Sequence, residues 1–112
     1  MTTAARTGIF IVGAKRTAFG AFGGALKTLS STDLAVHSSK AAIAHAKVDV
    51  AAIDETIFGN VIPSSLDAAY LSRHVALKSG MQIHTPSLNI NRLCGSGFET
   101  ACLSAESIIL GR

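Results

Sequence analysis

The sequence predicts an α/β fold, in which three strands and three helices alternate in the order β-α-β-α-β-α around a parallel sheet. Strand-like runs at residues 8–14, 56–62 and 86–91 are each followed by a segment with helical character, at 32–46, 67–79 and 97–110. The run at 8–14, GIFIVGA, is apolar throughout, which is typical of a strand covered on both faces. Two right-handed crossovers are expected to join the strands.

Short-range signals mark where the first two helices begin and end. Ser30 and Asp33 open the first helix, with the acid in its first turn. Alanines give this helix a small-residue face that suits close packing on a sheet. Pro63 stops the second strand. Gly80 ends the second helix, with Lys78 near the negative end of the helix dipole.

The third helix has the clearest amphipathic pattern. Ser96 and Glu99 have capping-box spacing, so the helix is expected to begin at about Ser96. Its apolar residues fall on one face: Phe98, Ala101, Cys102, Ala105, Ile108 and Ile109.

Residues 15–24, KRTAFGAFGG, are rich in glycine and carry two basic side chains. A phosphate-binding loop is one interpretation, but neither GxGxxG nor GxxxxGK[ST] spacing is present. A nucleotide-binding half-domain is therefore disfavoured, and an ordered surface loop is expected. The connection runs to about residue 30, which is long for a strand–helix loop and suggests a role at an interface.

Composition describes one modest globular domain of 112 residues, 48% hydrophobic and 15% charged. The net charge of +3 is not clustered, so no basic stripe predicts nucleic-acid binding. No apolar run reaches the roughly 20 residues of a membrane span. Without a CxxC or HxxxH pair, no metal site is expected.

The candidate catalytic residue is Cys94, in the segment NRLCGSGF at residues 91–98. It stands at a strand-to-helix corner, where the positive helix N-terminus favours a thiolate. Arg92 adds positive charge nearby, and Glu99 works against it. Gly95 and Gly97 would let a substrate approach the backbone closely. The competing interpretation is a small buried hydrophobic residue, which is the interpretation adopted for the mid-helix Cys102.

The two cysteines are not expected to form a disulfide. On or near one helix, their Cα atoms would be about 12 Å apart, and a disulfide needs less than about 7 Å. Reduced thiols indicate an intracellular compartment.

Four segments together resemble the thiolase family of acyl-CoA acyltransferases. They are residues 12–20 (VGAKRTAFG, with Ala18 where a proline is usual), 58–61 (FGNV), 70–74 (YLSRH) and 91–98, the segment of the active-site cysteine. They follow one another at family spacing along most of the chain. Within the family, the resemblance is greatest to the mitochondrial enzymes that act on 3-ketoacyl-CoA.

This resemblance implies thiolytic cleavage of 3-ketoacyl-CoA to acetyl-CoA and a shortened acyl-CoA, as in fatty-acid β-oxidation. Cys94 would be the nucleophile that carries the acyl-thioester intermediate, and its backbone N–H would contribute to the oxyanion hole. Coenzyme A would be a co-substrate, with no tightly bound cofactor. The complete enzyme would be a homodimer or homotetramer in the mitochondrial matrix, with the cytoplasm and the peroxisome as alternatives. A strand beginning at about Gly8 leaves no room for a cleavable presequence.

The resemblance covers only part of the family's chain, so residues 1–112 are interpreted as a partial N-terminal thiolase domain. Family members carry the histidine base, the second catalytic cysteine and most coenzyme A contacts in a C-terminal half that is absent here. No role is transferred to His37, His45, His74 or His84. Residues 1–112 alone are therefore expected to be inactive. The alternative is a non-catalytic fragment that acts as an interaction module.

Overall fold

The computed structural model of the chain describes residues 8–112. Its elements are α1 (Ser31–Ala46), β1 (Thr56–Gly59), α2 (Leu71–Lys78), β2 (Ser87–Ile90) and α3 (Ser96–Leu110), with short 3-10 helices η1 (Val50–Ala52) and η2 (Ala68–Tyr70). The two strands pair in parallel, with Thr56 opposite Ser87 and Gly59 opposite Ile90. The α/β class and the parallel sheet are therefore confirmed.

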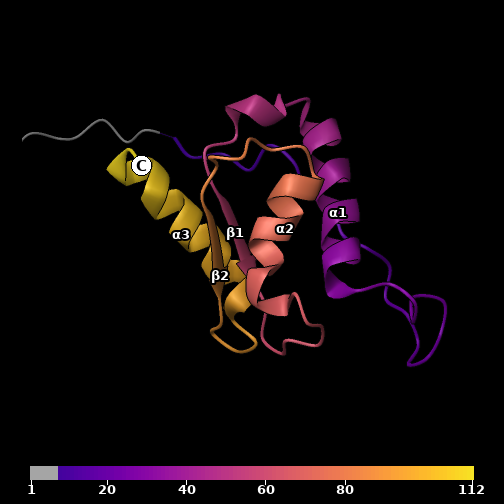
Figure 1. The fold of residues 1–112 in the computed structure, drawn as a ribbon. Helices are drawn as coiled ribbons and strands as arrows, with labels where there is room; N and C mark the ends of the chain where they lie inside the picture. Colours follow the sequence, from indigo (N-terminus) through magenta and orange to yellow (C-terminus); the bar gives the residue numbers. More distant parts are fainter. Residues whose placement is uncertain (1–7) are drawn as a thin grey trace, which may run out of the picture.

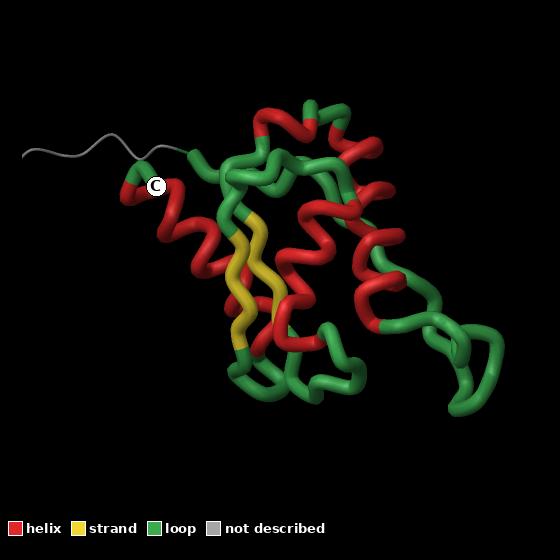
Figure 2. Tube along the Cα trace, in the orientation of Figure 1, coloured by secondary structure: helices red, strands yellow, loops and turns green. Residues whose placement is uncertain are grey.

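The elements lie in layers (Figure 1). Helix α3 contacts β1 on one face of the sheet, while α2 contacts both strands on the other face. Helix α1 packs on the outer side of α2. The small sheet, seen between the helices in Figure 2, consists of β1 and β2, and the connection between these two strands contains α2.

The expected strand at residues 8–14 does not form, and this part of the prediction is wrong. The segment pairs with neither strand and has no regular secondary structure. Instead, the segment lies against α1: a Cβ added to Gly13 would come within 2.9 Å of Ala42 O and 3.0 Å of Ala46 Cβ. The small-residue face of α1 is thus met by this extended segment and by α2, not by the sheet. An apolar run becomes a strand only where a neighbouring backbone offers the ladder hydrogen bonds.

The core of the described residues centres on α2 and the η2 turn before it. The buried apolar side chains are Ala68, Leu71, Val75 and Ala76. Val75 and Ala76 are completely buried. Burial of this kind is the main stabilising contribution to a small domain.

Side-chain hydrogen bonds tie α2 to both strands and to the loop that follows it. Ser72 Oγ donates to Thr56 O on β1 (2.9 Å), and Ser72 N donates to Asn89 Oδ1 on β2 (2.8 Å). Arg73 donates to Thr85 O (2.8 Å) and to Ile83 O. The guanidinium of Arg73 thus braces the chain between α2 and β2.

Asp67 joins α1 to α2 through its carboxylate. Oδ2 accepts from Thr32 Oγ1 on α1 (3.0 Å) and lies 3.2 Å from His74 Nδ1 on α2, while Oδ1 accepts from Ser65 Oγ (2.6 Å). These hydrogen bonds, from Ser65 first, then His74 and Thr32, hold the pKa of Asp67 well below its usual range. The contact between His74 Nδ1 and Asp67 Oδ2 was not expected from the sequence.

The helix ends agree with the short-range signals in two of three cases. Ser30 is the N-cap of α1, in a capping box with Asp33, and those hydrogen bonds lower the pKa of Asp33. Gly80 follows the C-cap residue of α2 with φ of +95°, a conformation that favours glycine. The capping box expected at Ser96 and Glu99 is absent, because Gly95 is the N-cap of α3 and makes no side-chain cap bond.

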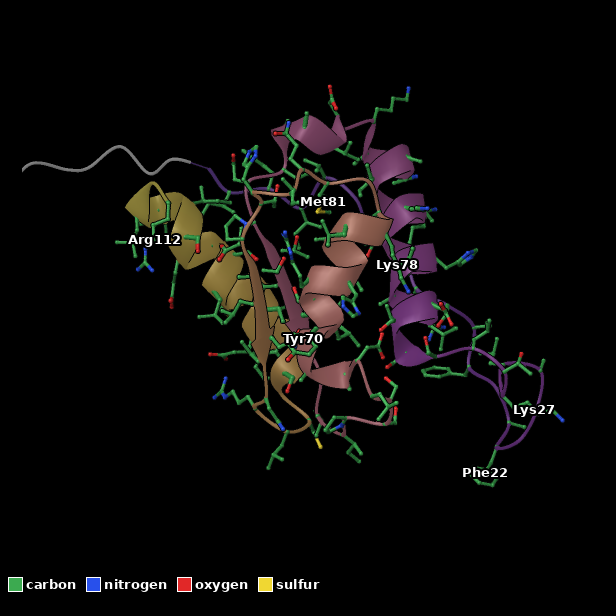
Figure 3. The ribbon with its side chains drawn as sticks, viewed as in Figure 1. Phe22, Lys27, Tyr70, Lys78, Met81 and Arg112 are labelled. Atoms are coloured by element: carbon green, nitrogen blue, oxygen red, sulfur yellow. The ribbon has the colours of Figure 1, made fainter. Side chains whose placement is uncertain are left out.

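The glycine-rich segment is a loop, as expected, and extends away from the N-terminal end of α1. Phe22 and Lys27 lie on this extension (Figure 3). The expectation about a presequence concerns residues 1–7, which lie outside the described residues. None of the helices within residues 8–112 combines the length and the apolar character required to cross a membrane.

The lowered pKa of Asp67 predicts acid-sensitive stability. Since its folded-state pKa lies below the ordinary value of 3.8, the ionised group stabilises the fold above that value, and this contribution disappears as pH falls through the folded-state pKa. We expect Asp67→Asn to lower the free energy of unfolding at about pH 6 and to converge with the wild type towards about pH 2. Urea unfolding across this range tests it, with Asp54→Asn as control. A difference that stays constant with pH would contradict the assignment.

Candidate functional site

Cys94 lies between β2 and α3, at the carboxyl end of the sheet. It follows β2 by four residues, immediately precedes the N-cap Gly95, and is exposed. In open parallel sheets, ligands bind beyond the carboxyl ends of the strands. The structure therefore places the predicted nucleophile where a substrate can reach it.

The first turn of α3 leaves donors free beside this corner. Gly95 N donates to Arg92 O (3.1 Å) and Ser96 N donates to Leu93 O (3.0 Å). Among the described residues, no acceptor lies within hydrogen-bonding geometry of the N–H groups of Gly97 and Phe98. A Cβ on Gly97 would meet nothing within 4 Å. Unpaired N–H groups at a helix N-terminus attract negative charge, so the turn can stabilise a thiolate or an oxyanion.

Ser96 bridges the loop to the helix in place of the expected capping box. Its side chain is buried, accepts from Arg92 N (2.8 Å) and donates to Leu93 O (2.7 Å). Glu99 instead forms an ion pair with Arg92. The Arg92 guanidinium carbon also lies 5.6 Å from the centre of the Phe98 ring.

The backbone is strained one residue before Cys94. Leu93 has φ of +50°, in the left-handed region that a leucine rarely adopts. Such a conformation costs about 1–3 kcal/mol and persists only where surrounding contacts hold it. Leu93 is itself 69% exposed, so burial of its side chain does not supply that hold.

Three asparagines line a hollow of about 220 Å³ beside this loop: Asn60 directly follows β1, Asn89 lies within β2, and Asn91 directly follows β2. Asn60 Nδ2 donates to Ala68 O (3.1 Å), and Asn89 Nδ2 donates to Ala69 O (2.8 Å). Asn91 donates to Val61 O. Sequence reasoning missed the bonding role of these residues; the asparagine directly after each strand, Asn60 and Asn91, was the available signal for two of them.

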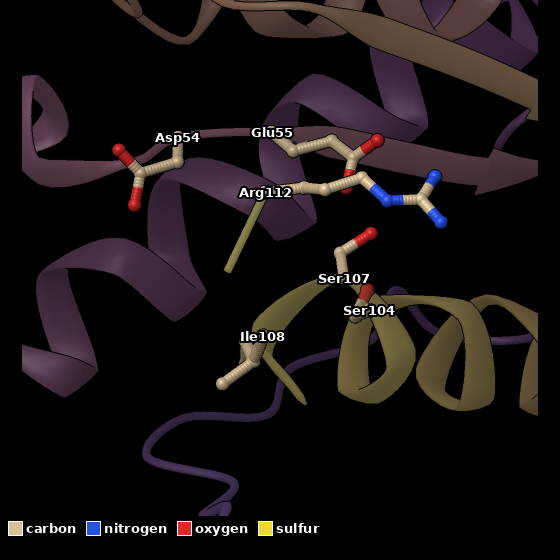
Figure 4. Close-up of a pocket in the computed structure, with 6 residues that line it drawn as sticks. All are labelled: Asp54, Glu55, Ser104, Ser107, Ile108 and Arg112. Carbon is tan, nitrogen blue, oxygen red and sulfur yellow. The ribbon is translucent and has the colours of Figure 1, made fainter. Parts of the chain in front are cut away.

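A second hollow, of about 180 Å³, lies at the opposite end of the sheet (Figure 4). It is lined by Asp54, Glu55, Ser104, Ser107, Ile108 and Arg112, at the amino end of β1 and the C-terminal part of α3. Cys94 is not among its residues, and the pocket contains neither histidine nor cysteine. It is therefore not the candidate site.

The remaining candidates do not join Cys94. His74 pairs with Asp67. Cys102, expected to be buried, is exposed because the face of α3 that carries it is uncovered; Ile109 on the same helix is 70% exposed. Both cysteines are free, which confirms that they form no disulfide.

Comparison with known proteins identifies relatives along nearly the whole chain. Residues 9–112 match the family described as the N-terminal domain of thiolase. The chain is 50% identical over 101 residues to the mitochondrial 3-ketoacyl-CoA thiolase of Homo sapiens, covering 90% of this chain and 25% of that enzyme. It is 38% identical over 103 residues to a beta-ketothiolase of Cupriavidus necator, covering 92% of this chain and 26% of that protein.

Comparison with solved structures identifies the same kind of relative. The crystal structure of human mitochondrial 3-ketoacyl-CoA thiolase in complex with CoA is similar with a TM-score of 0.89 at 49% sequence identity. The match covers 91% of this chain and 26% of that chain. The present chain therefore spans about a quarter of the length of these relatives.

The contact between α3 and β1 predicts that alanine substitutions at two glycines, Gly59 and Gly97, change the stability of the fold by different amounts. A Cβ on Gly59 would lie 2.7 Å from Ser96 Cβ and 3.1 Å from its carbonyl carbon. We expect Gly59→Ala to lower the free energy of unfolding by about 1–3 kcal/mol through overpacking. Gly97→Ala, which enters open space on the helix, is the control and should be neutral or stabilising by up to about 1 kcal/mol. Equal urea midpoints for the two variants would contradict the packing argument.

Proposed function

Because the chain belongs to the thiolase family, we propose that Cys94 is the nucleophile with which the complete protein cleaves 3-ketoacyl-CoA. The observation that carries this proposal is the position of Cys94, exposed at the carboxyl end of β2 and beside unpaired N–H groups of α3. The family resemblance of residues 91–98 supplies the chemistry.

The reaction proceeds in two acyl-transfer steps. The Cys94 thiolate attacks the ketone carbon C3, and the carbonyl oxygen becomes an oxyanion. The C2–C3 bond then breaks, its electron pair stays with C2, and C2 takes up a proton as acetyl-CoA leaves. The acyl group remains as a thioester on Cys94 until the thiolate of a second coenzyme A removes it. Covalent catalysis thus divides one difficult carbon–carbon cleavage into two easier steps.

The N-terminus of α3 supports this chemistry through the positive partial charge of its backbone N–H groups. The helix N-terminus stabilises the thiolate before attack. The backbone N–H of Cys94 contributes to the oxyanion hole, where one donor is worth about 3 kcal/mol. The histidine base and the second cysteine belong, by resemblance, to the C-terminal half of a thiolase.

The wider setting is proposed by similarity to the mitochondrial relative. Coenzyme A is the co-substrate, and no tightly bound cofactor is required. The complete protein works in fatty-acid β-oxidation in the mitochondrial matrix, as a homodimer or homotetramer. The partial domain of residues 1–112 carries the nucleophile.

Single-thiol variants test the role of Cys94. Trypsin leaves Cys94 and Cys102 on one peptide, residues 93–112, so Cys102→Ser and Cys94→Ser are labelled separately with iodoacetamide. We expect the Cys94 thiol to react severalfold faster, because the helix N-terminus favours its thiolate. Both cysteines are exposed, so access alone does not predict a difference.

The comparison is made in the folded chain and again in urea. In urea the two rates should become equal, since the helix N-terminus is lost. Equal rates in the folded chain would remove the support for a specialised Cys94.

A second candidate function, a non-catalytic interaction module, is favoured by the uncovered apolar surface. On α3, Phe98 is 63% and Ile109 is 70% exposed. On the N-terminal segment, Ile11 is 86% exposed. Apolar surface of this extent favours association with another chain.

Size-exclusion chromatography with light scattering tests this second function. We expect residues 1–112 to be associated or insoluble, and Ile109→Ser to weaken association more than the control Ile83→Ser, which changes an equally apolar exposed residue outside α3. A monodisperse monomer would contradict it. The same preparation should not cleave acetoacetyl-CoA, because losing part of a cooperating catalytic set can cost nearly as much as losing all of it. Cleavage that disappears in Cys94→Ala would refute this expectation of inactivity.

A further inference from the structure

We propose that Asn91 is the positioning residue of Cys94: its carboxamide holds Leu93 in the strained turn that fixes where Cys94 lies between β2 and α3. This inference rests on the proposed function, because it concerns the same nucleophile.

The carboxamide of Asn91 is used at both of its ends. Nδ2 donates to Val61 O (3.1 Å), and Oδ1 accepts from Leu93 N (3.0 Å). Val61 lies two residues beyond the end of β1, while Asn91 directly follows β2. One side chain therefore anchors the loop that carries Cys94 to the end of the neighbouring strand.

Leu93 is held through its backbone on both sides. Its N–H is taken by Asn91 Oδ1. Its carbonyl oxygen accepts from Ser96 Oγ (2.7 Å) and from Ser96 N (3.0 Å). Because φ of Leu93 is +50° and its side chain is exposed, these backbone contacts are what maintain the conformation.

The placement of Cys94 follows from this arrangement. Cys94 is the next residue after Leu93, so a change of φ at Leu93 from the left-handed region to an ordinary value would move Cys94 relative to the end of β2 and the start of α3. The contacts of Ser96 hold only the carbonyl oxygen of Leu93 and leave its N–H free for Asn91. Asn91 is the one side chain among residues 8–112 that bonds the N–H of Leu93.

The hollow beside the loop offers a matched control. Asn60 lines the same hollow and also donates to a backbone carbonyl, Ala68 O (3.1 Å), but its side chain makes no hydrogen bond to Leu93. Asn60→Ala therefore removes a hydrogen bond comparable to that of Asn91 with Val61 O, and it leaves the bond to the Leu93 N–H in place. If Asn91 acted only through its bond to Val61 O, the two alanine variants would be labelled alike.

The experiment measures the iodoacetamide labelling rate of Cys94 in Cys102→Ser, with circular dichroism to confirm folding. Losing one neutral hydrogen bond to the strained residue should slow labelling by about two- to tenfold in Asn91→Ala. Asn60→Ala should keep the parent rate. Adding Leu93→Gly to Asn91→Ala should restore most of the rate, because glycine adopts positive φ without strain.

Asn91→Ser keeps the test decisive if Asn91→Ala does not fold. A serine hydroxyl can still accept from the Leu93 N–H two residues on, so Asn91→Ser should label faster than Asn91→Ala, or near the parent rate. Parent-like labelling of Asn91→Ala, equal slowing in Asn60→Ala, no rescue by Leu93→Gly, or strong slowing in Asn91→Ser would each overturn the inference. Failure of the proposed function is separate: Cys94 would then react no faster than Cys102 before Asn91 is changed.

Discussion

The burial of α2 is the constraint on which the described structure depends. This helix lies between the sheet and α1, and it alone contributes apolar side chains that are completely buried, Val75 and Ala76. Ser72 on the same helix donates hydrogen bonds to both strands, from Oγ to Thr56 O and from N to Asn89 Oδ1. A two-stranded sheet is marginal by itself in water. Helix α2 therefore sets the register at which β1 and β2 end together, and with it the edge where Cys94 stands.

The sequence predicted those parts of the fold that depend on near neighbours. The capping box of Ser30 and Asp33 and the stop at Gly80 involve residues close in sequence, and both lie where expected. The strand at 8–14 needed a partner elsewhere in the chain, which hydrophobicity alone does not specify. The prediction that Cys102 is buried was wrong for the same reason: its helix face is apolar, but the described residues provide nothing to cover it.

The candidate site likewise has features set by near neighbours, which the sequence predicted, and features set by distant residues, which it did not. The corner position of Cys94 follows from a strand period that changes to a helix period at a glycine-rich turn, a local signal. The hydrogen bond from Asn91 to Val61 crosses 30 residues, and that from Thr32 to Asp67 crosses 35. Contacts of this kind leave no period in the sequence. The left-handed Leu93 is also invisible there, because leucine is an unusual choice for positive φ.

The electrostatics of the corner are simpler than its charged residues imply. Arg92 is paired with Glu99, so the two charges largely compensate each other at a distance. The asparagines that shape the loop are neutral. What remains near Cys94 is the N-terminus of α3, whose partial positive charge acts only within about one turn. A source of such short range is effective only if the thiol is held close to it, as it is at the residue directly before the N-cap Gly95. The strained turn before Cys94 is therefore the price of using backbone N–H groups, rather than a free cation, to favour the thiolate.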